Sequence, residues 1–97
     1  MFDTIIRGGT VLDGTGRPGF TADVGVTAGR ITAVDDLSAA PARRTIDASG
    51  KVVTPGFIDI HRHADAAAFR PGYGELELRQ GLTTIVNGNC GLSAAPF

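Results

Sequence analysis

Two histidines spaced one residue apart, His61 and His63 in the stretch GFIDIHRHAD, are the residues of this sequence best suited to chemistry. They follow apolar and β-branched residues that are typical of a strand. Alternate strand residues share a face, so we expect both imidazoles to point the same way, about 7 Å apart along the backbone. Neutral imidazole is a good ligand for Zn²⁺. The spacing alone fits either a shared cation or an ordinary polar strand end.

Three charged residues, Asp59, Arg62 and Asp65, accompany the histidines. Asp59 lies on the histidine face of the expected strand, and a metal-bound histidine usually gives its second N–H to an oxygen acceptor. We therefore predict that the Asp59 carboxylate accepts a hydrogen bond from a ligand histidine and so orients its ring. Arg62 falls on the opposite face and is expected to end in solvent. Asp65 has three interpretations: a more distant support, a residue that faces the substrate, or a solvated side chain.

The single cysteine, Cys90 in NGNCG, is the third candidate ligand. A free cysteine commonly packs as a small hydrophobe, but this one follows an expected strand and lies between glycines. In a parallel βαβ unit both strands end at the same edge, which is where α/β folds place their sites. Cys90 would meet the histidines there, and a thiolate is a strong Zn²⁺ ligand. The three residues together favour a metal site over a buried thiol.

The elements that must position these residues fall into two halves. The first half has short strand patterns, with a bulge expected at Gly8-Gly9 and a hairpin turn at Ala28-Gly29. These patterns indicate a small β-sandwich. They cover residues 4–12, 22–28, 30–34, 44–48 and 51–54.

The second half, residues 55–97, has the pattern strand, loop, helix, strand. The helix is expected at 75–80, ended by Gly81, and the second strand at 82–86. This order predicts one βαβ unit with a parallel strand pair. A parallel pair alone cannot cover both of its faces, so we expect the second half to begin something larger.

Size and charge exclude several classes of protein. The chain has 97 residues, a formal net charge of −1 and 42% hydrophobic residues, which indicates a globular domain with no electrostatic reason to bind nucleic acid or an anionic membrane. No apolar run approaches the ~18 residues of a membrane span, and the N-terminus lacks a secretory signal pattern. One cysteine cannot form an internal disulfide, which fits a reducing cytoplasm.

Four stretches of the sequence, taken in order, resemble the N-terminus of the amidohydrolase superfamily, in particular its N-acyl-D-amino-acid deacylase (D-aminoacylase) branch. They are DTIIRGGTVLDGTG, DVGVTAGRITAV, IDASGKVVTPGFIDIHRHAD and LRQGLTTIVNGNCG. PGFIDxHxH marks the superfamily, and GNCG is the more specific sign of the deacylase branch. The resemblance implies an α/β fold with a small β-sandwich. Residues 1–54 would be the N-terminal part of that sandwich, and residues 55–97 the first βαβ unit of an incomplete, metal-dependent (β/α)8 TIM barrel.

The resemblance also implies a role for each candidate ligand. His61 and His63 match the H-x-H ligands of one metal position, and Cys90 matches the cysteine that ligates zinc and can bridge two positions. One or two Zn²⁺ ions are therefore implied. The family usually has threonine or serine between the histidines, where this sequence has Arg62. Its other histidine ligands and its general base, an aspartate, come from later strands, so no catalytic residue is assigned in this chain.

The implied activity is zinc-dependent hydrolysis of the amide bond of N-acyl-D-amino acids, which places the parent protein among hydrolases of carbon–nitrogen bonds other than peptide bonds. We expect the 97 residues alone to be inactive, as an N-terminal fragment or one piece of a split or truncated enzyme that needs the remainder of the barrel. Two alternatives stay open. A cyclic amidase of the dihydropyrimidinase or dihydroorotase type would bridge its metals with a carboxylated lysine and leave Cys90 idle. A non-catalytic β module would pair with another chain through an exposed strand edge.

Overall fold

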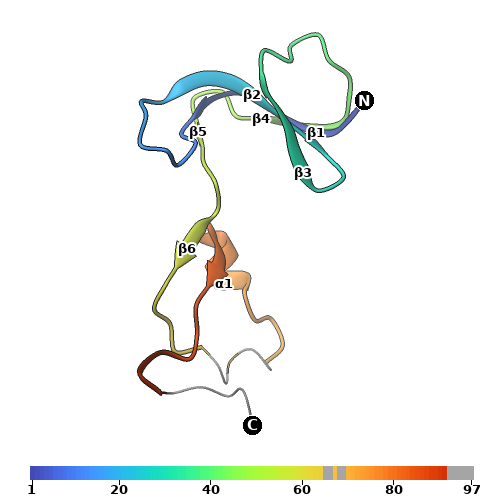
Figure 1. Ribbon diagram of the computed structural model, residues 1–97. Coiled ribbons are helices and arrows are strands. Elements are labelled where there is room, and N and C mark those ends of the chain that lie inside the picture. Colours follow the sequence, from blue (N-terminus) through green and yellow to red (C-terminus); the bar gives the residue numbers. More distant parts are fainter. Residues whose placement is uncertain (65–66, 68–69, 92–97) are drawn as a thin grey trace. The chain divides into compact units, whose positions relative to one another are not determined.

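The structure is a computed structural model that describes residues 1–64, 67 and 70–91. Its internal contacts divide the chain into two compact units, Met1–Pro55 and Gly56–Phe97 (Figure 1). The described part of the first unit contains five strands, and that of the second contains two strands and a short α-helix. No helix in the described ranges is both long enough and apolar enough to cross a bilayer.

The first unit is built around its N-terminal strand. β1 (Phe2–Val11) pairs antiparallel with β2 (Phe20–Thr27), which pairs antiparallel with β3 (Arg30–Asp35). On the other edge of β1 lie β4 (Ala42–Asp47) and β5 (Val52–Val53), both parallel to it. β1 is therefore the central strand of a five-stranded mixed sheet.

Two backbone features of this sheet confirm the glycine pattern. The register of β1 against β2 shifts between Ile6 and Gly9, which is the expected bulge. A Cβ atom at Gly9 would lie 2.5 Å from Cγ2 of Val53, so the glycine leaves room for this side chain of β5. Ala28 and Gly29 both have positive φ, 50° and 73°, as a two-residue type I′ hairpin turn requires.

A polar contact inside the first unit was not predicted. Asp23, only 9% exposed, accepts hydrogen bonds from the main-chain N–H groups of Gly8 (2.8 Å) and Leu37 (2.9 Å). The guanidinium of Arg7 donates to the carbonyl oxygens of Leu37 and Ala40. Together these side chains fix the bulge and the loop between β3 and β4.

The first unit is a single sheet rather than two packed sheets in the part of the chain that the structure describes. One region of the sheet is an open apolar hollow of about 220 Å³. Ile31 in this hollow is 68% exposed and Val34 is 45% exposed. The lining includes Ile6, Val24, Val26, Ile31, Val34 and Val53. A second sheet, as the expected sandwich requires, is therefore not found in the described part of this unit.

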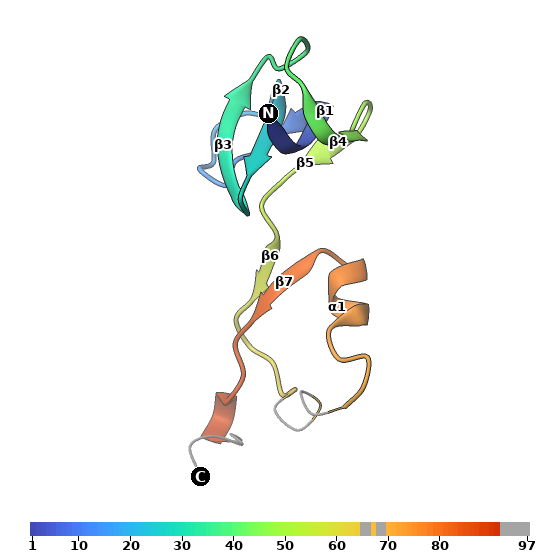
Figure 2. The same ribbon diagram turned by 90° about the vertical axis from the view of Figure 1, so that its right-hand side faces the viewer.

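The second unit has the expected order of strand, helix and strand. β6 (Phe57–Asp59) pairs parallel with β7 (Leu82–Ile85), and α1 (Glu75–Arg79) lies between them in the chain (Figure 2). Gly81 follows the helix with φ +85°, which confirms the expected helix end. β6 stops at Asp59, earlier than predicted, so His61 and His63 follow the strand instead of continuing it.

Candidate metal centre

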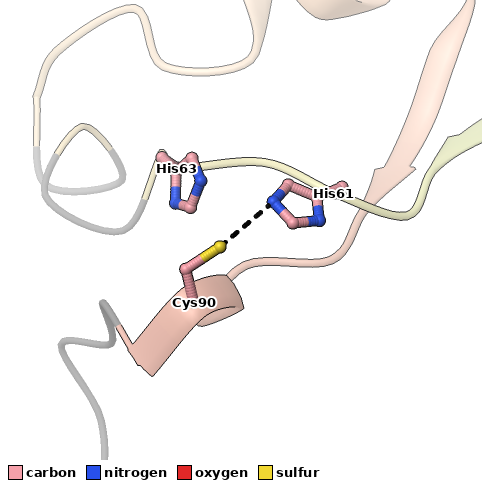
Figure 3. A group of neighbouring side chains, drawn as sticks. All are labelled: His61, His63 and Cys90. Atoms are coloured by element: carbon pink, nitrogen blue, oxygen red, sulfur yellow. Dashed lines mark hydrogen bonds between the residues drawn. The ribbon is translucent and has the colours of Figure 1, made fainter.

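The three candidate ligands lie beyond the carboxyl ends of two paired strands. His61 and His63 follow β6, and Cys90 lies in a short 3₁₀ turn, Asn89–Gly91, that follows β7. Because β6 and β7 are parallel, these segments leave the sheet at the same edge. All three side chains are exposed, and the sulfur of Cys90 points toward His61 with His63 beside it (Figure 3).

The distances between these side chains suit a shared cation. Sγ of Cys90 lies 3.6 Å from Nε2 of His61, and the two imidazole rings are 5.1 Å apart at an interplanar angle of 81°. One ligand atom from each of the three residues lies within 4.8 Å of the other two. In a tetrahedral zinc site with the usual bond lengths, nitrogen and sulfur ligands are about 3.5–3.6 Å apart. The donor set and its spacing therefore fit Zn²⁺.

The main chain between the strands and the ligands is held by two further hydrogen bonds. The N–H of Val86 donates to the carbonyl of Asp59 (2.8 Å), and the N–H of Arg62 donates to the carbonyl of Val86 (3.1 Å). Cys90 then adopts a left-handed backbone with φ 56° and ψ 26°. Such a conformation costs a non-glycine residue about 1–3 kcal/mol, so the surrounding contacts must hold it.

Arg62 departs from its predicted position in solvent. Its guanidinium forms ion pairs with Asp59 (3.5 Å) and with Glu77 of α1 (2.8 Å), and the side chain is 31% exposed. Because β6 ends at Asp59, strand alternation no longer sets the direction of Arg62, and the two carboxylates attract it. The spacing in the sequence gave no signal for Glu77, which lies 15 residues away.

The two aspartates singled out by the sequence differ in what the structure shows. Oδ1 of Asp59 accepts a hydrogen bond from the main-chain N–H of His61 (3.1 Å). Among the described residues, no hydrogen bond joins the Asp59 carboxylate to an imidazole nitrogen. Its support of a ligand ring stays a prediction. Asp65 lies outside the described residues.

Comparison with known proteins places the chain in a family. A model described as "Amidohydrolase family" matches residues 44–96, more than half of the chain. The chain belongs to the amidohydrolase family. The matched segment of this amidohydrolase contains both histidines and Cys90.

Curated relatives resemble this amidohydrolase along nearly its whole length. N-acyl-D-glutamate deacylase of Alcaligenes xylosoxydans xylosoxydans is 53% identical over 95 residues, which cover 97% of this chain and 19% of the relative. The chain thus spans about a fifth of the length of the curated relatives it matches.

Solved structures of deacylases also resemble the chain along nearly its whole length. D-aminoacylase with a binuclear metal centre matches with a TM-score of 0.93 and 56% identity, covering 100% of this chain and 20% of that one. N-acyl-D-glutamate deacylase from Bordetella bronchiseptica, complexed with zinc and a phosphonate mimic of the tetrahedral intermediate, matches with a TM-score of 0.93 and 52% identity, covering 98% and 20%. An L-hydantoinase (dihydropyrimidinase) from Arthrobacter aurescens is more distant, with a TM-score of 0.69 and 32% identity, covering 90% and 20%.

Proposed function

We propose that this chain is the N-terminal part of a zinc-dependent amidohydrolase that hydrolyses the amide bond of N-acyl-D-amino acids. The observation that carries the proposal is the convergence of two imidazoles and one thiol within 4.8 Å. The deacylase relatives, about half identical to the chain, support the substrate class. Because the chain spans about a fifth of their length, the substrate contacts and the general base are proposed to come from the rest of the full-length protein.

The proposed zinc ligands are His61, His63 and Cys90, which would hold one ion or take part in a pair. A zinc ion supplies Lewis acidity, which activates water near neutral pH and polarises an amide carbonyl. The histidines would contribute neutral nitrogen donors and Cys90 a thiolate, which would lower the net charge of such a centre. Arg62 and Asp59 hold the ligand segment through an ion pair and a main-chain hydrogen bond.

We further propose the domain assignment that the resemblance implied. Residues 1–54 would form the N-terminal part of a small β-sandwich, and residues 55–97 the first βαβ unit of a (β/α)8 barrel. The open apolar hollow of the first unit supports the sandwich, since such a surface is usually covered in a folded protein. The parallel β6–β7 pair supports the barrel, which needs ~250 residues in all.

The alternatives are less well supported. A cyclic amidase of the dihydropyrimidinase type would have no use for Cys90, yet the thiol lies 3.6 Å from an imidazole nitrogen. The hydantoinase structure is also a weaker match than the deacylases. A non-catalytic β module would need no cluster of three metal-binding side chains at one sheet edge.

The test is Cys90→Ala in the full-length protein, with zinc content and hydrolysis of N-acyl-D-amino acids measured together. We expect both to be lost while the far-ultraviolet circular dichroism is retained. Arg79→Ala is the control, since its 73% exposed side chain pairs with Glu75 of the same helix and should change neither quantity. A Cys90→Ala protein with full zinc content and full activity would refute the proposal.

A further inference from the structure

Two asparagines on either side of Gly88 reach from the loop after β7 to the segment that carries His63. Nδ2 of Asn89 donates hydrogen bonds to the carbonyl oxygens of Arg62 (3.1 Å) and Val86 (2.7 Å). Oδ1 of Asn87 accepts a hydrogen bond from the main-chain N–H of Ala64 (3.3 Å). The residues immediately before and after His63 are therefore both held by side chains of the loop that carries Cys90.

These side-chain bonds lie just beyond the main-chain hydrogen bonds of Val86, which join the two segments after the strands end. Gly88 and Cys90 then take positive φ values of 77° and 56°, so the loop leaves the extended geometry that a sheet ladder requires. Here the two amide side chains tie the histidine segment to the cysteine turn.

The two asparagines have opposite hydrogen-bonding roles. Asn89 faces two carbonyl oxygens, so it must donate, and a carboxylate in its place would repel both. Asn87 faces an N–H group, so it must accept, and a carboxylate in its place would still accept. The same substitution, asparagine to aspartate, therefore breaks the contact at one position and keeps it at the other.

We propose that Asn89 is a positioning residue that helps to set His63 and Cys90 at the spacing a shared zinc ion needs. This inference rests on the proposed function, because it assumes that His61, His63 and Cys90 bind zinc. The hydrogen bonds of Asn89 go to main-chain carbonyl oxygens, so it acts through the main chain of the histidine segment. Loss of groups that orient metal ligands typically lowers metal affinity about 10–100-fold.

The experiment compares Asn89→Asp with Asn87→Asp in the metal-free full-length protein, titrated with Co²⁺. Both variants add one negative charge to the same loop, so any general attraction for a cation is matched. We expect Asn89→Asp to lower Co²⁺ affinity about 10–100-fold and to weaken the thiolate-to-cobalt charge-transfer absorption. Asn87→Asp should stay within about 3-fold of the original protein, well below that range, and keep this absorption.

Each other outcome has a definite meaning. Equal affinities in the two aspartate variants, whether both high or both low, overturn the inference. If Asn89→Asp does not accumulate as folded protein, Asn89→Ala replaces it, and an unchanged Co²⁺ affinity in that variant likewise overturns the inference. If the unsubstituted protein itself binds Co²⁺ without a thiolate absorption, the proposed zinc site fails, and that result is separate from any comparison between the variants.

Discussion

The sulfur of Cys90 lies 3.6 Å from Nε2 of His61, although the two residues are 29 positions apart in the chain. The parallel pairing of β6 with β7 brings them together, because each residue follows one of the two strands. The proposed site therefore depends on one strand pair and on the loops that leave its carboxyl edge.

The first prediction concerns the histidines. His61→Ala and His63→Ala in the full-length protein should each lower zinc affinity by more than about 100-fold, since loss of a direct ligand should exceed the loss of an outer partner. Equilibrium dialysis against a zinc buffer measures this, with Arg79→Ala as the unaffected control. A histidine variant that keeps the original affinity would remove that residue from the ligand set.

The second prediction concerns the ion pair between Arg62 and Glu77, whose side chains are 31% and 19% exposed. A double-mutant cycle with alanine at both positions should give a coupling free energy of about 0.5–1 kcal/mol in the full-length protein. The exposed pair Arg79–Glu75 is the matched control and should couple by less than about 0.5 kcal/mol. Equal coupling in the two cycles would show that Arg62 does not anchor its segment to α1.

The third prediction concerns pH. A hydrogen bond from the Ser49 side chain, followed by one from the Ser49 main-chain N–H, lowers the pKa of Asp47 below its ordinary value of 3.8. A lowered pKa in the folded state stabilises the protein above pH 3.8 and loses that effect as the pH falls through the folded pKa. Ser49→Ala should therefore lower the unfolding temperature at about pH 7 and have a much smaller effect once Asp47 is protonated.

The unfolding temperatures of the full-length protein and of its Ser49→Ala variant are compared from about pH 7 down to the pH at which Asp47 is protonated. Lys51→Ala is a suitable control, because its charge is the smallest of the causes that lower the pKa of Asp47. A Ser49→Ala defect that stays constant from neutral to acid pH would contradict the assignment.

The fourth prediction concerns the apolar hollow of the first unit. If later residues of the full-length protein cover it, Ile31, 68% exposed here, becomes buried there. Ile31→Asp should then lower the free energy of unfolding by at least about 1.5–3 kcal/mol, the usual value of burying such a side chain. Arg30→Asp, the exposed neighbour in β3, should change it by less than about 0.5 kcal/mol. If both substitutions lower the free energy of unfolding by the same small amount, the hollow stays open in the full-length protein.

Much of the fold could be predicted because its causes are local in the sequence. The bulge at Gly8-Gly9, the turn at Ala28-Gly29 and the end of α1 at Gly81 each require a backbone geometry that glycine provides. The meeting of His61 with Cys90 could also be predicted, since parallel strands end at a common edge.

The unpredicted contacts share a different physical cause. Asp23, Asn87 and Asn89 hydrogen-bond to main-chain groups of distant loops, and such contacts leave no periodic pattern in the sequence. The predicted direction of Arg62 was wrong because the strand ends earlier than its apolar pattern indicated. The side chain instead turns toward two carboxylates, with which it forms ion pairs.

The central place of β1 in its sheet has a consequence for how the protein is made. Translation delivers β1 before the strands that pair with it, because β2, β4 and β5 all come later in the chain. Until then both edges of a ten-residue strand remain unpaired, a state that favours aggregation and attracts holdase chaperones. Expression in cells depleted of such chaperones should therefore lower the yield of soluble protein, because the unpaired β1 would aggregate.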